Sequence, residues 1–376
     1  MRLPPPDLLA ARAQRLRDSI SARQLDGLVI TSLPNIAYLT GFFATAAALV
    51  VTSETVILVS DARYARPLQD RAREWPEVRT VMLDAGQSYD DAIVAVLGAF
   101  NGLRLGFEAS HLTFGRHRYL SGRLHASGST PPLVDTDGIV EGLRVVKDWW
   151  EIERLRDGGE RLSRVAKCIL SKALAGLAES AVAAEIEAAL RREGFERAAF
   201  DTIVAAGPNT ALPHARAGSR RIEPGDLVMM DFGGVLDGYC TDVTRTVIAG
   251  PGNQRGRRLI ARVIEAQDAA FRVVRAGVAP EDVDAAARAA LARHEIGDAF
   301  THGTGHGLGL EIHEAPRVTR ARDGEAEPPL APGMVFTVEP GVYFERFGGV
   351  RIEDDLLVTE NGAEWLTDIP RACEPI

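Results

Sequence analysis

One pattern occurs twice in the C-terminal half of this 376-residue chain. The first copy, Pro224–Asp231, is PGDLVMMD, and the second, Pro332–Glu339, is PGMVFTVE. In each copy Pro-Gly predicts a turn, an apolar β-type run follows, and a carboxylate ends the run. Burying a carboxylate without a partner costs several kcal/mol or more. We therefore expect both Asp231 and Glu339 to meet a cation or strong hydrogen-bond donors.

A second carboxylate follows the first copy. Asp237-Gly238, between apolar residues, predicts a two-residue hairpin turn. With that turn Asp231 lies opposite Thr244, and Asp242 lies diagonally beside Asp231 on the same face of the hairpin. Two like charges on neighbouring strands repel each other, so this pair predicts a positive charge between them.

The second copy has the same arrangement. Gly348-Gly349 is interpreted as a turn or bulge, which sets Glu339 roughly opposite Glu353. Lys or Arg can supply the missing positive charge, but two divalent ions balance four carboxylates. Ions about 3.5–4 Å apart also suit carboxylates that bridge or chelate. The sequence therefore favours a pair of metal ions.

Histidines accompany the carboxylates. The segment THGTGHGLGLEIHE contains His302, His306 and His313 among glycines that allow the backbone to approach a site closely. His214 precedes the first hairpin. Any one of these residues also has a structural explanation, since a lone carboxylate can cap a turn or pair with an arginine. Their joint occurrence favours the metal site.

With these residues the chain resembles the metallopeptidases of the methionine aminopeptidase and prolidase class, which have the pita-bread fold. The resemblance is strongest to Xaa-Pro dipeptidase (prolidase) and aminopeptidase P, and it covers almost the whole chain. Its most specific parts are the Asp231 and Asp242 spacing, the histidine spacing, and the segments PGMVFTVEPG and RIEDD. The resemblance implies five metal ligands: Asp231, Asp242, His306, Glu339 and Glu353.

Four carboxylates and one imidazole favour Mn²⁺, with Co²⁺, Zn²⁺ or Fe²⁺ as alternatives. Water that bridges two such ions is acidified to hydroxide near neutral pH, so amide hydrolysis is the expected reaction. The resemblance implies cleavage of the Xaa-Pro bond in dipeptides or short peptides. It also implies that Glu339, a ligand, handles the proton of the water, with His214 and His313 as further catalytic residues.

The resemblance places His214, His302 and His313 around the scissile carbonyl and the proline of the substrate. Arg351 is expected to organise the metal ligands and to contribute to substrate binding. Arg317 resembles an arginine that prolidases use near the substrate carboxylate, although aminopeptidases P can carry it too. We hypothesise that Arg317 binds a free carboxylate directly after proline, which predicts faster cleavage of dipeptides than of tripeptides.

Two domains are expected. Residues 1–140 predict a small α/β domain, in which NIAYLTGF and DARY resemble segments of the creatinase/prolidase N-terminal domain. Its predicted helices are 4–20, 62–73, 88–100 and 112–123, and its predicted strands are 27–31, 48–52, 55–59 and 80–83. Residues 141–376 predict an α+β catalytic domain of the pita-bread type.

The catalytic domain is expected to have two halves related by a pseudo-two-fold axis. Helices predicted at 149–175 and 180–192 precede the first hairpin, and AGLA at residue 175 recurs as AGVA at residue 276. Each helix-helix-hairpin half would contribute two carboxylates to one site. Residues 317–332, rich in charge and proline, predict a surface loop.

Charge and composition exclude some partners. The net charge of −9 comes without a basic stripe, which argues against nucleic acid. The longest apolar run, 44–51, is too short to span a membrane, and residues 1–23 lack the apolar region of a signal peptide. Three cysteines without a C-x-x-C spacing fit a reduced cytoplasm. We expect a cytoplasmic homodimer.

Two other function classes stay open. A small-molecule hydrolase or lyase on the same fold, creatinase-like or related, is the first. Creatinase typically lacks this metal set, but metal-retaining small-molecule enzymes would share the ligands. A non-catalytic peptide-binding protein is the second, and it would be expected to have lost ligands that are intact here.

Overall fold

The computed structural model describes residues 2–75, 77–126, 128, 133–321 and 327–371. The chain forms two compact units, Arg2–Arg144 and Val145–Ile376. The boundary predicted after residue 140 falls within α6 (Ile139–Arg144), a helix that packs against α1 (Pro6–Ala22) of the N-terminal unit.

The N-terminal unit contains one six-stranded sheet with strand order β4-β3-β2-β1-β5-β6. Strand β2 is antiparallel to both of its neighbours, and the other pairs are parallel. The strands are β1 (Gly27–Ile30), β2 (Ala48–Thr52), β3 (Val56–Ser60), β4 (Val78–Met82), β5 (Leu105–Glu108) and β6 (Leu133–Thr136). The remaining helices are α2 (Leu33–Thr40), η1 (Ala62–Tyr64), α3 (Ala65–Glu74), α4 (Tyr89–Gly98) and α5 (Phe114–Ala126).

The expected α/β character of this unit is confirmed, but α2, β5 and β6 were not predicted. Strand β5 has four residues that are all buried, so it shows no alternation of polar and apolar side chains. Helix α2 has a proline in its first turn and ends at Gly41, whose φ is 60°. Proline at a helix start and glycine just after its end are typical helix signals, and they could have revealed α2.

The first half of the second unit consists of two helices and a four-stranded sheet. Asp148 caps the first helix in a reciprocal arrangement with Glu151. Strand β9 is central, with β10 on one side and both β7 and β8 pairing with it. The elements are α7 (Trp149–Leu170), α8 (Glu179–Arg192), β7 (Arg197–Ala198), β8 (Ile203–Ala206), η2 (Gly207–Ala211), β9 (Leu227–Leu236) and β10 (Tyr239–Ile248).

The hairpin of β9 and β10 has the predicted register. Asp231 pairs with Thr244, and Asp242 pairs with Gly233. The turn residues Asp237 and Gly238 have φ values of 51° and 85°. Positive φ at both central residues is what a type I′ turn requires, which explains why Asp-Gly fixed this register.

The second half repeats two helices before a hairpin. Its main sheet has the order β12-β11-β13-β16-β17, and β14 pairs with β15 beside it. The elements are α9 (Gln254–Val273), α10 (Pro280–Ala292), η3 (Gly297–Ala299), β11 (Gly305–Gly307), β12 (Glu314–Val318), β13 (Val335–Val338), β14 (Gly341–Phe344), β15 (Gly348–Arg351), β16 (Asp354–Thr359) and β17 (Gly362–Trp365).

Of the turn or bulge predicted at Gly348-Gly349, the turn is wrong. Both glycines lie in β15, where they pair with Phe344 and Tyr343, so the chain reverses over 345–347. A Cβ atom at Gly349 would lie 2.4 Å from the carbonyl oxygen of Thr210. Close packing against the first half of the unit, and not a turn, therefore requires glycine here.

The loop predicted at 317–332 begins later than expected. Arg317 and Val318 belong to β12 and the loop follows them, while 322–326 lie outside the described residues.

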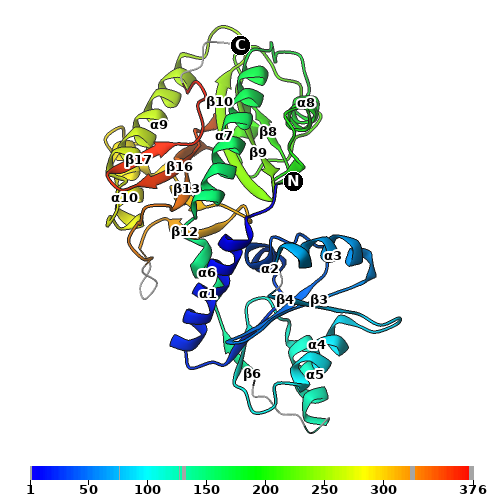
Figure 1. The fold of residues 1–376 in the computed structure, drawn as a ribbon. Coiled ribbons are helices and arrows are strands. Elements are labelled where there is room, and N and C mark those ends of the chain that lie inside the picture. Colours follow the sequence, from blue (N-terminus) through cyan, green and yellow to red (C-terminus); the bar gives the residue numbers. More distant parts are fainter. Residues whose placement is uncertain (1, 76, 127, 129–132, 322–326, 372–376) are drawn as a thin grey trace. The chain divides into compact units, whose positions relative to one another are not determined.

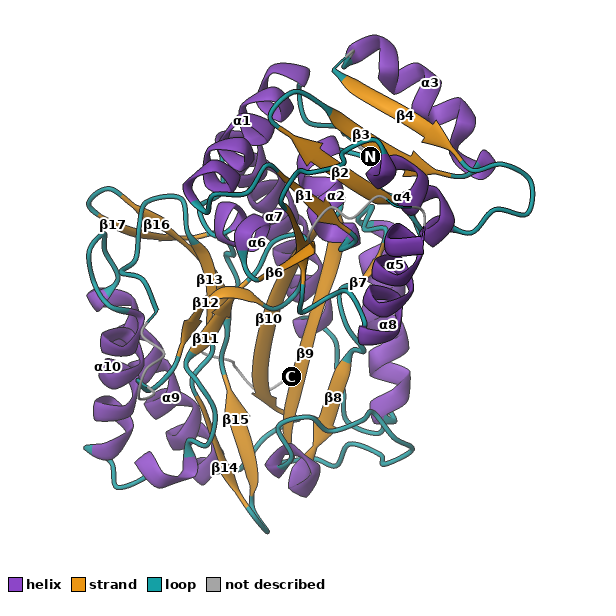
Figure 2. Cartoon of the chain, turned by 90° about the horizontal axis from the view of Figure 1, so that it is seen from below, coloured by secondary structure: helices purple, strands orange, loops and turns teal. Residues whose placement is uncertain are grey.

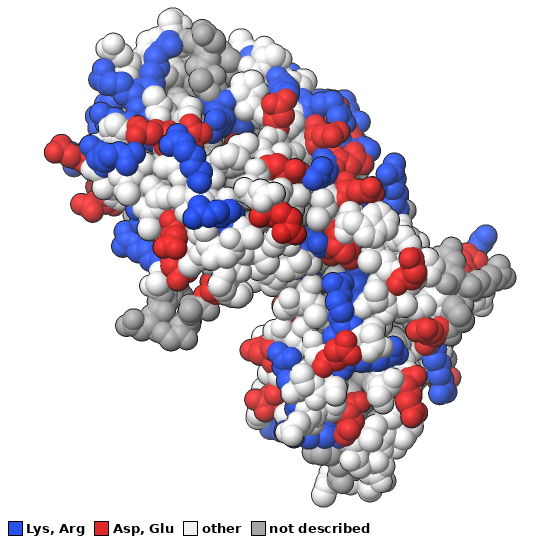
Figure 3. All heavy atoms as spheres, turned by 60° about the vertical axis from the view of Figure 1, so that its left-hand side comes forward, with Lys and Arg blue, Asp and Glu red and all other residues white. Residues whose placement is uncertain are grey.

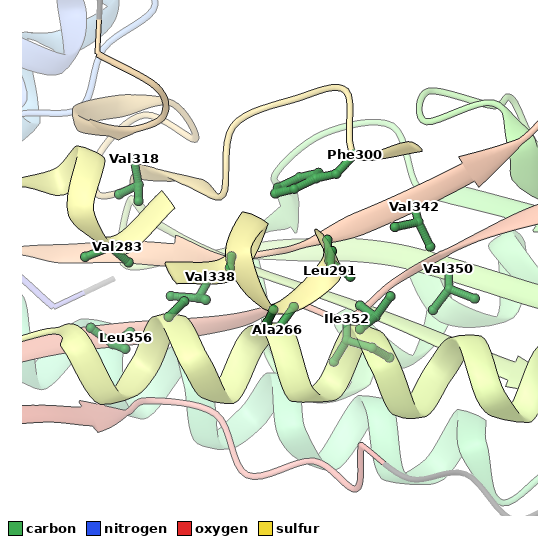
Figure 4. Packing of buried hydrophobic residues seen from close by; sticks show 14 of the residues in the cluster. Ala266, Val283, Leu291, Phe300, Val318, Val338, Val342, Val350, Ile352 and Leu356 are labelled. Carbon is green, nitrogen blue, oxygen red and sulfur yellow. The ribbon is translucent and has the colours of Figure 1, made fainter. Parts of the chain in front are cut away.

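Each half of the second unit has its own apolar core. Figures 1 and 2 show α9 and α10 on one side of the strands and α8 on the other. Ala266 and Leu291 from the helices meet Val338 of β13, and Ile352 between β15 and β16, in the core of the second half (Figure 4). A second cluster joins α7 and α8 to β8, β9 and β10. Two separate cores support the two-halved organisation expected from the repeat.

Charged side chains of both signs are interspersed over the face shown in Figure 3. Among the described helices, none has both the length and the hydropathy needed to cross a membrane.

Candidate metal centre

The structure brings the five predicted ligands together where the two halves of the second unit meet. His306 Nε2 lies 3.6 Å from Glu339 Oε1 and 3.9 Å from Asp242 Oδ2. One ligand atom from each of Asp242, His306 and Glu353 falls within 4.8 Å of the others. Asp231 joins them on the wall of one pocket of about 960 Å³. Both halves thus supply carboxylates, as the repeat predicted: Asp231 and Asp242 lie in β9 and β10, Glu339 directly follows β13, and Glu353 directly precedes β16.

The cluster is electrostatically unfavourable without a cation. Burial is the largest cause that raises the pKa of Asp242 and of Glu353 well above the usual range, and neighbouring carboxylates raise both further. Burial also raises the pKa of Glu339. Within the described part of the chain, buried Asp231 Oδ1 and Asp242 Oδ1 have no hydrogen-bond partner. The donor set and its partnerless oxygens fit divalent metal ions.

His306 is held in the form that a metal ligand requires. Its Nδ1 lies 3.1 Å from the carbonyl oxygen of Gly307, which can only accept, so Nδ1 donates. Burial lowers the pKa of His306, which favours the neutral ring. Nε2 therefore keeps its lone pair toward Asp242 and Glu339.

Hydrogen bonds of their backbone amides hold three of the ligand residues in place. The Asp242 amide donates to Asp355 Oδ2 at 3.0 Å, and the Glu339 amide donates to the Thr304 carbonyl at 2.7 Å. Thr337 Oγ1 accepts from the His306 amide at 3.1 Å. Such contacts fix the ligand positions before any ion binds.

Arg351 lies within the cluster. Its guanidinium is buried and forms an ion pair with Asp231 through Nη2. Its Nε donates to Thr244 Oγ1 at 3.1 Å, and its Nη1 donates to Tyr343 Oη at 2.7 Å. These contacts support the expected role in organising Asp231, which stays a prediction.

Tyr343 was not identified from the sequence. His302 Nδ1 lies 2.8 Å from the Gly303 carbonyl and must donate to it, so His302 Nε2 accepts from Tyr343 Oη at 2.9 Å. Burial raises the pKa of Tyr343 to about 12, which keeps its hydroxyl protonated. In this arrangement His302 Nε2 carries no hydrogen, so it cannot donate to a substrate. Only the position of Tyr343, four residues after Glu339, could have indicated its role.

The other two histidines also line the pocket. The His313 ring lies with its centroid 4.2 Å from that of His306 in an edge-on arrangement. Burial, and then the proximity of His306 and His214, lowers the pKa of His313. His214 follows η2 and is exposed. The predicted histidines are thus close together, and their catalytic roles remain predictions.

Arg317 pairs with His306 in the register of β11 and β12. Its side chain is 52% exposed, lines the pocket, and donates through Nε to Glu327 Oε1 at 2.8 Å. A substrate carboxylate would therefore compete with Glu327 for this guanidinium.

The first half of the unit also supplies a wall of the pocket, of which the sequence indicated only His214. Helix α8 contributes Ser180, Ala183, Ala184 and Glu187, and the segments 200–203 and 213–217 complete this wall. Strand β8 positions it, because Ile203 pairs with Asp231 on β9.

Comparison with protein-family models gives two matches. Residues 153–360 match the model described as "Metallopeptidase family M24", and residues 12–146 match the "Creatinase/Prolidase N-terminal domain".

Individual proteins are similar over nearly the full chain. An uncharacterised peptidase, YqhT, of Bacillus subtilis (strain 168) is 35% identical over 96% of this chain and 98% of its own. The structure of an Xaa-Pro dipeptidase from Bacillus anthracis has a TM-score of 0.88 and 32% identity, covering 98% of this chain and 99% of that one. An X-Pro aminopeptidase from Thermotoga maritima has a TM-score of 0.85 and 31% identity, covering 97% and 99%.

Proposed function

Because this chain belongs to metallopeptidase family M24, with a pita-bread catalytic domain after a creatinase/prolidase N-terminal domain, we propose that it is a dinuclear metal-dependent Xaa-Pro peptidase. Its substrates would be Xaa-Pro dipeptides or short peptides with proline in the second position. The supporting observation is that four carboxylates line one pocket with His306. Three of them are buried, and Asp231 Oδ1 and Asp242 Oδ1 lack partners within the described residues.

Five residues of this chain would hold the metal ions. Mn²⁺ is the expected ion, with Co²⁺, Zn²⁺ or Fe²⁺ as alternatives. When bound, two divalent ions would acidify a water molecule and polarise the scissile carbonyl. The holding residues would be Asp231, Asp242, His306, Glu339 and Glu353.

Glu339 would carry the proton. It is only partly buried, lines the pocket, and its Oε1 faces both His306 Nε2 and the Thr337 hydroxyl. A carboxylate in this position can take a proton from the attacking water and return it to the prolyl nitrogen as the bond breaks. The nitrogen needs that proton because the departing proline must leave as an amine.

The histidines would bind the substrate around the reacting bond. Proline has no amide hydrogen and a rigid ring, so the pocket must accept a tertiary amide. His214 and His313 line the pocket and can donate to the developing oxyanion, an interaction worth about 2.7–4 kcal/mol in other hydrolases. Tyr343 would fix the ring of His302 beside the substrate.

Arg317 would distinguish dipeptides from longer peptides by binding the carboxylate after proline. Its pairing with Glu327 supports an alternative in which Arg317 is not available and the enzyme acts as an aminopeptidase P. The names of the similar structures include both activities.

One comparison of substrates tests the proposal. The protein is purified, supplied with Mn²⁺, and assayed with an Xaa-Pro dipeptide, an Xaa-Pro-Yaa tripeptide and a small amidine or betaine. Cleavage of the dipeptide above the tripeptide is expected. Cleavage of the amidine or betaine alone would instead support a small-molecule hydrolase on this fold. The homodimer and the cytoplasmic location stay predictions from the sequence.

A further inference from the structure

Lys147 and Glu314 form a buried ion pair outside the metal cluster. Their side chains are 1% and 7% exposed, and Lys147 Nζ lies 3.1 Å from Glu314 Oε2. Lysine and glutamate are almost never this buried without a charged partner, because each ion loses its hydration. The two residues are 167 positions apart, and Glu314 directly follows His313, which lines the pocket.

The lysine end of the pair is anchored firmly. The Lys147 amide donates to the Gly333 carbonyl at 2.9 Å, and Val146 forms a β-bridge with Met334. Asp148 then caps α7. Lys147 is therefore fixed between the start of α7 and the start of β13, which are rigid elements of the catalytic unit.

The glutamate end organises a loop. Glu314 Oε1 accepts from the Glu311 amide at 2.9 Å, and the Gly309 amide donates to the Glu311 carbonyl at 3.0 Å. The Gly309 carbonyl accepts from the Cys240 amide at 2.7 Å. A Cβ atom at Gly309 would lie 2.9 Å from both carboxylate oxygens of Glu314. The segment 309–314 is thus wrapped closely around one buried carboxylate.

This loop presents Ile312 and His313 to the pocket. The edge-on contact between His313 and His306 depends on the backbone on both sides of His313, which the Glu314 carboxylate holds. We propose that Lys147 and Glu314 are positioning residues whose ion pair sets the place of His313 against the substrate, an inference that rests on the proposed peptidase function. Neither Lys147 nor Glu314 is among the residues that line the pocket, so the pair would act through His313.

Replacing Lys147 with a neutral residue tests whether the ion pair positions His313. Lys147→Met keeps the length of the side chain but removes the ammonium that lies 3.1 Å from the buried Glu314 carboxylate, so we expect the loop to rearrange. A displacement of about 1 Å in a catalytic group can cost about 100-fold in rate. We expect kcat/KM for an Xaa-Pro dipeptide to fall roughly 10- to 100-fold in Lys147→Met. Adding Glu314→Gln, which removes the second charge and keeps an acceptor for the Glu311 amide, should recover part of that loss.

The deciding experiment combines Lys147→Met with His313→Ala in the full-length, metal-supplied protein. If the pair acts through His313, adding Lys147→Met to His313→Ala should lower kcat/KM little further. The matched control is Arg154→Met, which removes a different buried cation, one that lies in α7 and is paired with Asp237 at 3.5 Å. The fold-losses in kcat/KM caused by Arg154→Met and by His313→Ala should multiply when the two are combined, because Asp237 lies at the β9–β10 turn. If the fold-losses in kcat/KM of Lys147→Met and His313→Ala also multiply, the proposal is overturned.

A second measurement does not depend on turnover. Hydrogen exchange of the backbone amides in 309–314, followed by mass spectrometry, should become faster in Lys147→Met and stay unchanged in Arg154→Met. Unchanged exchange in Lys147→Met would also overturn the proposal. If the wild-type protein cleaves no Xaa-Pro peptide, the proposed function fails, and the exchange result still decides whether the ion pair holds the loop.

Discussion

Thr244 and Glu353 connect the two halves of the catalytic unit at the metal-ligand cluster itself. Thr244 Oγ1 donates to Glu353 Oε2 at 2.5 Å, and the Glu353 amide donates to the Thr244 carbonyl at 3.0 Å. Thr244 also pairs with Asp231 across the first hairpin. One threonine therefore fixes the distance between ligands of the first half and a ligand of the second.

Thr244→Val should weaken metal binding. Valine has nearly the same shape but cannot donate to Glu353 Oε2, so the carboxylate loses the contact that orients it. Loss of such an orienting contact typically lowers metal affinity about 10- to 100-fold. We expect a loss in this range for the affinity of Thr244→Val for Mn²⁺, measured by calorimetric titration. Thr246→Val is the matched control, because the hydroxyl of Thr246 bonds to the backbone of Arg351 and not to a ligand carboxylate. Equal losses of affinity in both variants would contradict the role of Thr244.

Removal of the metal should abolish hydrolysis and lower stability. Chelation leaves buried carboxylates facing each other, and adding Mn²⁺ at about 100 times its Kd should stabilise the fold by about 2.7 kcal/mol per site. Elemental analysis of the reconstituted protein should give two ions per chain, and Asp242→Ala should be inactive. Full activity of Asp242→Ala, or the absence of tight metal binding, would contradict the dinuclear site.

The metal-free protein should lose stability as the pH rises. Burial raises the pKa of Asp242 and of Glu353 above their unfolded values, so the folded state binds more protons than the unfolded state between those values. Their contribution is therefore favourable below the unfolded carboxyl pKa of about 4 and is lost as the pH rises through the folded pKa. We expect the Tm of the metal-free protein to differ between pH 5.5 and pH 7.5. This difference in Tm should be smaller for Asp242→Asn than for wild type. An identical difference would argue against the cluster as the source.

Arg317→Ala should reduce dipeptide hydrolysis selectively. Loss of a charge-assisted hydrogen bond costs about 1.5–3 kcal/mol, or roughly ten- to a hundred-fold in kcat/KM, on a substrate whose carboxylate Arg317 binds. Glu327→Gln should have the opposite effect on dipeptides, since it weakens the competing ion pair. Steady-state kinetics with a dipeptide and a tripeptide measure both changes, with Arg320→Ala as a nearby control. Equal losses on the two substrates would favour the aminopeptidase P activity.

The sequence predicted those parts of the site that depend on local geometry. Asp237-Gly238 specifies a type I′ turn, and that turn alone sets Asp231 opposite Thr244. The turn at Gly348-Gly349 was predicted wrongly because glycine serves both turns and close approaches, and the contact of Gly349 with Thr210 spans both halves of the unit.

Roles that depend on distant partners could not be predicted. A tyrosine on a short strand has the same pattern whether it faces the core or a pocket, so the pattern around Tyr343 gave no signal beyond its nearness to Glu339. Lys147 likewise acquires its partner only when the chain folds, because Glu314 lies far away in sequence. Such pairings depend on tertiary packing, which local propensity does not record.

The two carboxylate-bearing hairpins also have a consequence for the order of folding. The β9–β10 hairpin closes over a two-residue turn, so Asp231 and Asp242 can come together early and locally. The contact of Thr244 with Glu353 spans 109 residues and must wait for a much larger loop to close. Closing that loop brings the negative charges of the second hairpin against those of the first, so docking of the halves is the step that repulsion slows. Divalent ions should therefore accelerate the late, docking phase of refolding and leave hairpin formation unchanged.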